Sequence, residues 1–171
     1  MGIMPIDAVE RLQEGCEILG KMAAKQSIAQ WEIVASQAYG TSVDIERGRI
    51  ALAAGGGDGG FGIRVVEDGR YGFAYVGRPE EGGDAISQAL SIARKSPQIK
   101  GFHLPSASKG TSVDGLFDAR VDQLTPDDLL NNADDLISMV AGICPNGVVS
   151  GGGVGATISA SALLTSEGIE S

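Results

Sequence analysis

A glycine run in the middle of the chain is the first feature whose spacing could serve a chemical purpose. In AAGGGDGGFGIRVV, the residues Gly55, Gly57 and Gly60 satisfy the G-x-G-x-x-G pattern of dinucleotide-binding sites. Such a site needs a helix directly after the glycines, because the helix N-terminus holds the pyrophosphate. The segment that follows, FGIRVV, alternates and is β-branched, so it predicts a strand. We therefore interpret the run as a mobile loop that connects strands. Saturable binding of NAD or ATP would instead support the alternative of a nucleotide-binding site.

A second glycine-rich segment fails the same test. Gly151, Gly153 and Ala156 nearly repeat the pattern, but TISAS follows them and again predicts a strand. Both glycine segments are therefore typical of connections between strands rather than of phosphate-binding loops.

The remaining reactive residue types are sparse. His103 is the single histidine, and no CxxC or CxxH pair exists, which argues against a zinc site or a histidine-dependent triad built from this chain. Cys16 and Cys144 lie on apolar faces of predicted helices and are interpreted as structural free thiols. The carboxylates of 127–128 and 134–135 fit helix capping and a solvated helix face better than a catalytic pair.

Arg64 differs from these residues. It stands mid-strand between Ile63 and Val65, on the face opposite the main apolar one. An arginine there could hold a carboxylate or a partner, although an exposed strand arginine without a role is the alternative.

Composition limits the class of protein. The 171 residues carry a formal net charge of −9, which argues against a nucleic-acid partner, because phosphate neutralisation needs clustered Lys and Arg. The N-terminus lacks the pattern of a signal peptide, and no run reaches the roughly 18 apolar residues of a membrane span. We expect a soluble, cytoplasmic protein.

The first half of the chain predicts a helix and then an antiparallel meander. The helix runs from Pro5 to Lys25, and the next two strands are joined by a turn at Tyr39-Gly40. A bulge or bend at residues 47–49 leads into a further strand. The clearest signal is a hairpin around Asp68-Gly69.

The returning strand of that hairpin has two different faces. Tyr71, Phe73 and Tyr75 share one face, while Gly72 and Ala74 make the other flat. A helix or another backbone can approach such a flat strip closely.

The second half of the chain adds two helices and the last strands. One helix has Asp84 as its N-cap and ends at Pro97, and the other starts at Thr125 and ends at Pro145. Residues 99–124 are predicted to be a long irregular excursion, and 146–171 to form two more strands, or one strand and a β-excursion. The prediction is a single domain, 1–171, of the α/β class (α+β type), with three helices packed on a mainly antiparallel sheet of five to seven strands.

The segment FGIRVVEDGRYGFAYVGRP resembles the amino-terminal domain of the TldD/PmbA family of peptide-processing metalloproteases. The resemblance extends in order through WEIVASQAYGTSVDIERGRI, DAISQALSIARKSP, VDGLFDARVDQLTPDDLLNNADDL and LLTSEGIES. It covers essentially the whole chain and rests on the succession of segments rather than on one diagnostic motif.

The resemblance implies a zinc site outside this chain. Active members of the family hold zinc with the two histidines of an HExxxH helix and a later cysteine, and the glutamate of that motif would serve as general base. This sequence contains no HExxxH, so no catalytic or metal residue is carried over. We interpret the chain as an amino-terminal fragment without a cofactor of its own, with zinc in the full-length parent or its partner. The alternative is a parent from the zinc-less PmbA branch, which pairs with a zinc-bearing subunit.

The same resemblance implies a role in a two-subunit assembly. The domain would wall the chamber in which an unfolded peptide reaches the zinc, as a homodimer or as a heterodimer with a paralogous subunit, and would capture the peptide by strand addition. The alternative from another class is a non-enzymatic module that binds peptides or proteins. The residues expected to contact a peptide or partner are Arg64, Arg70, Tyr75 and His103.

Overall fold

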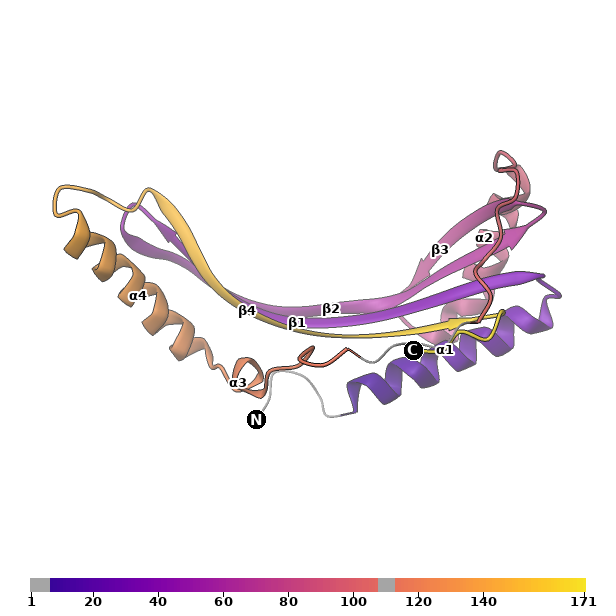
Figure 1. Cartoon of the computed structure of the whole chain (residues 1–171), viewed down its shortest axis with the longest axis horizontal. Helices are drawn as coiled ribbons and strands as arrows, with labels where there is room; N and C mark the ends of the chain where they lie inside the picture. Colours follow the sequence, from indigo (N-terminus) through magenta and orange to yellow (C-terminus); the bar gives the residue numbers. More distant parts are fainter. Residues whose placement is uncertain (1–6, 108–112) are drawn as a thin grey trace. The chain divides into compact units, whose positions relative to one another are not determined.

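The computed structural model describes residues 7–107 and 113–171, and its fold is α+β (Figure 1). In chain order the elements are α1 (Ala8–Lys25), β1 (Gln30–Glu46), β2 (Arg49–Glu67), β3 (Arg70–Val76), the 3-10 helix η1 (Pro79–Glu81), α2 (Gly82–Lys95), α3 (Ala119–Asp122), α4 (Pro126–Ile143) and β4 (Gly151–Thr165). The strands form one antiparallel sheet with the order β3-β2-β1-β4. The predicted class is therefore confirmed. The described residues contain four strands rather than five to seven, and four α-helices rather than three.

The strand count is lower because β1 does not turn at Tyr39-Gly40. Both residues lie inside β1, and a Cβ atom on Gly40 would come within 2.8 Å of the Thr157 hydroxyl oxygen on β4. Gly40 thus permits close approach of the neighbouring strand rather than a turn. The turn lies instead at Arg47-Gly48, where φ is 50° and 70°, so the predicted bulge is the hairpin between β1 and β2.

The glycine run is also part of a strand. Gly55, Gly57 and Gly60 all lie in β2, so the predicted mobile loop is wrong. A side chain on Gly57 would collide with the ring of Tyr39 in β1. The glycines therefore make room for neighbouring strands and for aromatic side chains that lie across them.

The described residues group into two compact units. Unit 2 comprises residues 7–37, 59–107 and 160–171, and unit 1 comprises 38–58 and 113–159. β1, β2 and β4 each contribute residues to both.

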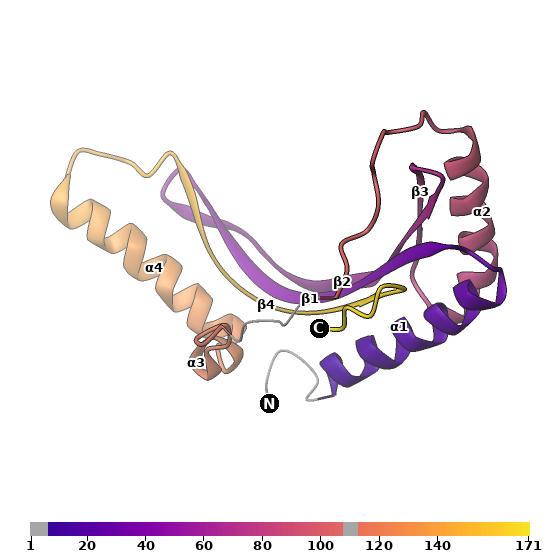
Figure 2. The ribbon, with the colours of Figure 1, turned by 45° about the vertical axis from the view of Figure 1, so that its right-hand side comes forward.

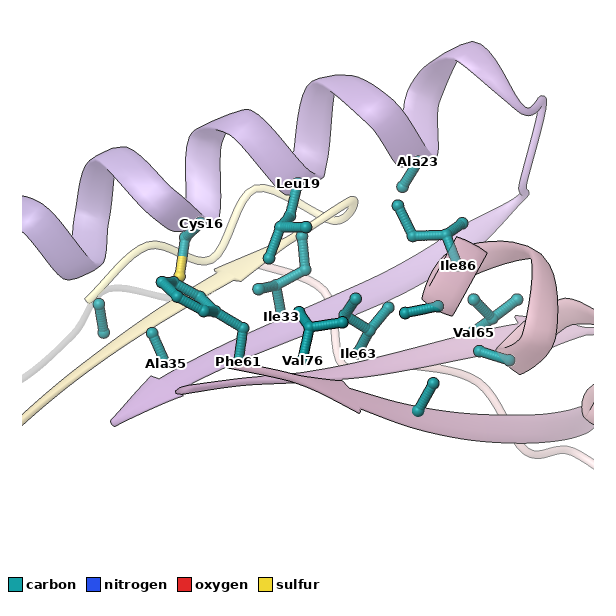
Figure 3. Packing of buried hydrophobic residues seen from close by; sticks show 14 of the residues in the cluster. Cys16, Leu19, Ala23, Ile33, Ala35, Phe61, Ile63, Val65, Val76 and Ile86 are labelled. Atoms are coloured by element: carbon teal, nitrogen blue, oxygen red, sulfur yellow. The ribbon is translucent and has the colours of Figure 1, made fainter. Parts of the chain in front are cut away.

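In unit 2, α1 and α2 cover one face of the strands. Leu19 and Ala23 of α1 face Ile33, Ile63 and the α2 residue Ile86 in a dry core (Figure 3). Cys16, Ala35, Phe61, Val65 and Val76 belong to the same cluster. On α1, Leu12, Cys16, Leu19 and Ala23 are buried, whereas Val9 is exposed.

α2 lies directly along β3 (Figure 2). The predicted flat strip is the reason, because a Cβ on Gly72 would collide with the carbonyl oxygen of Ala89. The helix begins at Gly82 with Glu81 as N-cap, so Asp84 lies in the first turn rather than at the cap. The hairpin at Asp68-Gly69 is confirmed, with φ of 51° and 69° at the turn.

In unit 1, α4 packs on β1 and β4. Its core consists of Leu129 and Ala133 with the strand residues Val43, Ile45 and Ala156. The predicted start at Thr125 is confirmed as a capping box with Asp128.

The rest of unit 1 departs from the predicted pattern. Cys144, which was expected on an apolar helix face, is exposed, and so is Leu136, because the buried contacts of α4 are made by Leu129 and Ala133. The described parts of the 99–124 excursion are irregular apart from α3, and residues 108–112 lie outside the described residues. The final segment forms one long strand, β4, as one of the two alternatives predicted. In the part of the chain that the structure covers, no helix combines the length and apolarity needed to cross a membrane.

Candidate functional site

Three aromatic side chains form an exposed row on β3 in unit 2. Tyr71, Phe73 and Tyr75 are 44%, 51% and 58% exposed. They alternate with Gly72, Ala74 and Val76, which are buried on the helix-covered face. We call Tyr71, Phe73 and Tyr75 the aromatic row.

Two rings of the aromatic row, those of Phe73 and Tyr75, are supported by glycines of β2. Phe73 pairs with Arg64 and Tyr75 with Gly62 in the β2–β3 register. The Phe73 ring covers Gly62 so closely that a Cβ there would lie 3.0 Å from it. The Tyr75 hydroxyl donates a hydrogen bond to the carbonyl oxygen of Gly59 at 2.8 Å. The glycines thus let the rings lie flat and fix their positions before any ligand arrives.

A charge pair adjoins the aromatic row on the same face. Arg64 Nη1 lies 2.9 Å from Glu32 Oε1 on β1, and their side chains are 42% and 17% exposed. The better buried Glu32 orients the guanidinium, and the exposed part of Arg64 keeps donors free for a second acceptor.

The other two predicted contacts have different surroundings. Arg70 donates from Nη1 to the carbonyl oxygen of Ser96 at 2.5 Å, so it binds the C-terminal end of α2. His103 is exposed rather than packed among its neighbours, and its Nδ1 lies 2.9 Å from the carbonyl oxygen of Gly101. Of the four predicted residues, Arg64 and Tyr75 lie together on the face of the aromatic row, and Arg70 does not lie on that face.

Sequence reasoning did not name all residues of this face. The Phe102 ring centroid lies 5.6 Å from that of Tyr71, so Phe102 bounds the aromatic row at one end. Besides Phe102, the site predictions omitted Glu32, Tyr71 and Phe73. The alternation of aromatic residues in RYGFAYV was the available signal for Tyr71 and Phe73.

Two acidic groups, Asp118 and Asp128, serve structural contacts. Hydrogen bonds from Thr125 hold the pKa of the Asp128 carboxyl below its usual value. Hydrogen bonds from Arg120 do the same to the pKa of Asp118. Asp128 is therefore a capping residue, as the sequence predicted.

The described residues do not fit the zinc ion that the family implies. No three of their His, Cys, Asp and Glu side chains lie close enough together to hold a metal ion. Burial raises the pKa of Cys16 to about 11, which keeps its thiol protonated at neutral pH. The aromatic row and Arg64 are suited to binding rather than to bond cleavage.

The comparisons with known proteins agree with the fold. Residues 31–96, which include β3 and its glycine support, match the family model described as PmbA/TldA metallopeptidase domain 1. This match identifies the first domain of the TldD/PmbA family in residues 31–96. A curated relative, the "Uncharacterized protein MJ0231" of Methanocaldococcus jannaschii, is 26% identical over 155 residues, which are 90% of this chain and 35% of that protein.

Solved structures share the fold of this TldD/PmbA domain. TldE from Thermococcus kodakarensis has a TM-score of 0.81 at 23% identity, covering 92% of this chain and 36% of that one. A putative modulator of DNA gyrase from Bacteroides thetaiotaomicron gives 0.78 at 20% identity, covering 97% and 39%. A second putative modulator of DNA gyrase, from Thermotoga maritima, gives 0.75 at 16% identity, covering 92% and 36%. The chain thus spans little more than a third of the length of each relative.

Proposed function

We propose that this TldD/PmbA domain handles unfolded peptides for a peptidase, and that the aromatic row is where it holds them. The observation that carries the proposal is the row itself: three large aromatic side chains stand about half exposed, and two of them, Phe73 and Tyr75, lie against glycines of β2. Exposed aromatic groups in an ordered row mark binding surfaces rather than ordinary solvent-facing strand positions.

The spacing of the aromatic row suits an extended chain. Alternate residues of a strand lie about 7 Å apart, so the three rings repeat at the period of side chains on one face of an extended peptide. Aromatic rings bury apolar side chains with little preference for sequence, and Arg64 beside them can bind an acidic side chain or a C-terminal carboxylate. The row would therefore accept many peptides provided that they are unfolded.

In this proposal the domain walls the substrate chamber and takes part in assembly, while the zinc site belongs to the rest of the parent protein or to a paralogous partner. Strand addition at a sheet edge can add main-chain hydrogen bonds to the same peptide. The glycine runs lie within β2 and β4 and are therefore part of the sheet.

Binding of an unfolded protein tests the proposal. Reduced, carboxymethylated α-lactalbumin serves as the probe, and its affinity for the chain is measured by fluorescence anisotropy. We expect Phe73→Ala to weaken binding at least about fivefold, because one stacked ring is lost. Phe117→Ala is the matched control, since Phe117 is 62% exposed in unit 1 and should leave the affinity unchanged. Equal affinities for the wild type and Phe73→Ala would refute the assignment of the aromatic row.

A further inference from the structure

Arg64 is the one cation among the described strand positions that share the face of the aromatic row in unit 2. Side chains alternate along a strand, so this face takes every second residue of β1, β2 and β3. Apart from Glu32, the other residues at those positions are uncharged, and β4 carries no charged residue. A single arginine among uncharged side chains gives this face one place at which a charged group of a ligand can be bound.

The exposure of Arg64 and Glu32 decides which sign of charge a ligand finds there. The Arg64 side chain is 42% exposed, and that of Glu32 is 17% exposed. The guanidinium has five N–H donors, and its contact with Glu32 involves Nη1, so the exposed part of the side chain retains donors for a second acceptor. The Glu32 carboxylate is mostly covered and already has a partner. An anionic group of a ligand therefore has access to Arg64, whereas a cationic group has little access to Glu32.

Long-range attraction does not provide such binding. The chain has a formal net charge of −9, which repels acidic ligands, and Glu32 offsets the positive charge of Arg64. A ligand carboxylate is therefore held only by direct contact, and two parallel N–H···O bonds from one guanidinium provide that contact. Any preference for carboxylates on this face thus depends on Arg64 itself.

The strand register places Arg64 beside the middle ring of the aromatic row. Arg64 and Phe73 are directly opposite each other in the β2–β3 pair. The Phe73 ring covers Gly62, two residues from Arg64 along β2, whereas the guanidinium reaches Glu32 on β1. Two residues of a strand span about 7 Å, which is also the spacing of alternate side chains in an extended peptide. An apolar side chain on Phe73 and a carboxylate on Arg64 therefore fit peptide positions that are two residues apart.

We propose that Arg64 gives the aromatic row a preference for peptides that carry a carboxylate two residues from an apolar side chain, with Glu32 positioning the guanidinium. The inference rests on the peptide binding proposed above and names the class of peptide that this site takes. An acidic side chain and a free C-terminus can both supply the carboxylate.

Three peptides that differ in one group test this preference. The reference is the uncharged acetyl-Phe-Ala-Phe-Ala-Gln-amide; the second has Glu in place of Gln, and the third has a free C-terminal carboxylate in place of the amide. Each is titrated into the isotope-labelled chain in about 0.15 M salt, where charges more than about 8 Å apart are screened. We expect one or both charged peptides to bind at least about threefold tighter than the reference, as measured by amide chemical shifts. The tighter of the two identifies the source of the carboxylate, and equal affinities of all three would overturn the proposal.

Two substitutions of Arg64 assign the preference to its guanidinium. Arg64→Gln removes the charge, so both charged peptides should bind as the reference peptide does. An unchanged affinity for the reference peptide shows that the aromatic row of this variant is still folded. Arg64→Lys keeps a cation beside Glu32 without the planar fork, so the preference should fall below that of the wild type. An undiminished preference in either variant would overturn the proposal.

Arg94→Gln is the matched control for the change in net charge. Arg94 is 62% exposed and pairs with Glu67 at 2.9 Å, and it belongs to α2, which covers the other face of the strands. This variant should bind all three peptides like the wild type. Loss of the preference in Arg94→Gln would attribute it to net charge and contradict the assignment to Arg64.

The outcome is separable from the proposed peptide binding. Phe73→Ala should weaken the binding of all three peptides, whereas Arg64→Gln should weaken only that of the charged ones. If the three peptides bind equally and Phe73→Ala weakens them all, the aromatic row remains the binding site and only the role of Arg64 fails. If none of them binds the wild type at millimolar concentration, the proposed peptide binding fails as well.

Discussion

At the scale of single residues, Gly72 determines how closely α2 approaches the sheet. A Cβ there would collide with the Ala89 carbonyl oxygen and lie 2.6 Å from the Ala93 amide nitrogen. Both atoms belong to helix backbone and cannot rotate away, so we expect Gly72→Ala to lower the free energy of unfolding by about 1–3 kcal/mol. Urea denaturation measures this change.

Gly77→Ala is the matched control for that substitution. No atom lies within 4 Å of a Cβ built on Gly77, and its φ is not positive. Its stability should stay level or rise by up to about 1 kcal/mol, because alanine reduces the entropy of the unfolded chain. Equal effects of the two substitutions would contradict the packing described for Gly72.

The two cysteines should differ in reactivity. Cys16 is buried against Ala35 and Phe61 with its pKa raised to about 11, whereas Cys144 is exposed. Because the thiolate is the reactive form, iodoacetamide at pH 8 should alkylate Cys144 in the native protein and reach Cys16 only after unfolding. Peptide mass spectrometry checks this, and rapid native labelling of Cys16 would argue against the core of unit 2.

At the scale of elements, α4 depends on its capping box. The Asp128 amide donates to the Thr125 hydroxyl at 3.2 Å, and the Asp128 carboxylate accepts from the Thr125 amide at 2.8 Å. Thr125→Ala should cost about 1 kcal/mol of stability. The folded pKa of Asp128 is lowered, so the carboxylate's contribution is present above the usual carboxyl pKa and is lost as the pH falls through the folded value.

Urea denaturation of the wild type and of Asp128→Asn between pH 3 and pH 7 measures that pH dependence. The two curves should differ most at pH 7 and converge under acid, since both side chains are then uncharged. A difference that is constant across the range would exclude an electrostatic role for Asp128.

Local sequence signals correctly predicted those elements whose geometry depends on residues close together in the chain. The hairpin at Asp68-Gly69, the start of α4 and the flat strip at Gly72 needed only turn chemistry, capping and alternation. Gly40 and the β2 glycines were misread because glycine marks both turns and close strand contacts. At 17 and 19 residues, β1 and β2 are also far longer than the usual strand of about six residues.

The candidate site shows the same limit. Alternation placed Arg64 and Tyr75 on faces from sequence alone. The pairing of Arg64 with Glu32 depends on the register between β1 and β2, and the bond from Arg70 to Ser96 depends on where α2 ends. Neither follows from local sequence, because both contacts join segments far apart in the chain.

At the scale of the whole molecule, we propose that this domain binds peptides and that catalysis takes place elsewhere in the parent protein or its partner. We therefore expect the purified chain to release no fragments from carboxymethylated α-lactalbumin with zinc added, as measured by mass spectrometry. Metal-dependent cleavage that persists after contaminating proteases are removed would contradict this assignment.

The most direct test of the central claim is a titration of the isotope-labelled chain with carboxymethylated α-lactalbumin, followed by amide chemical shifts. We expect saturable shifts centred on residues 71–75 of β3 and 62–64 of β2, and we expect the Phe73→Ala variant to lose them. No shifts at millimolar probe, or shifts confined to residues outside the aromatic row and its glycine support, would contradict it.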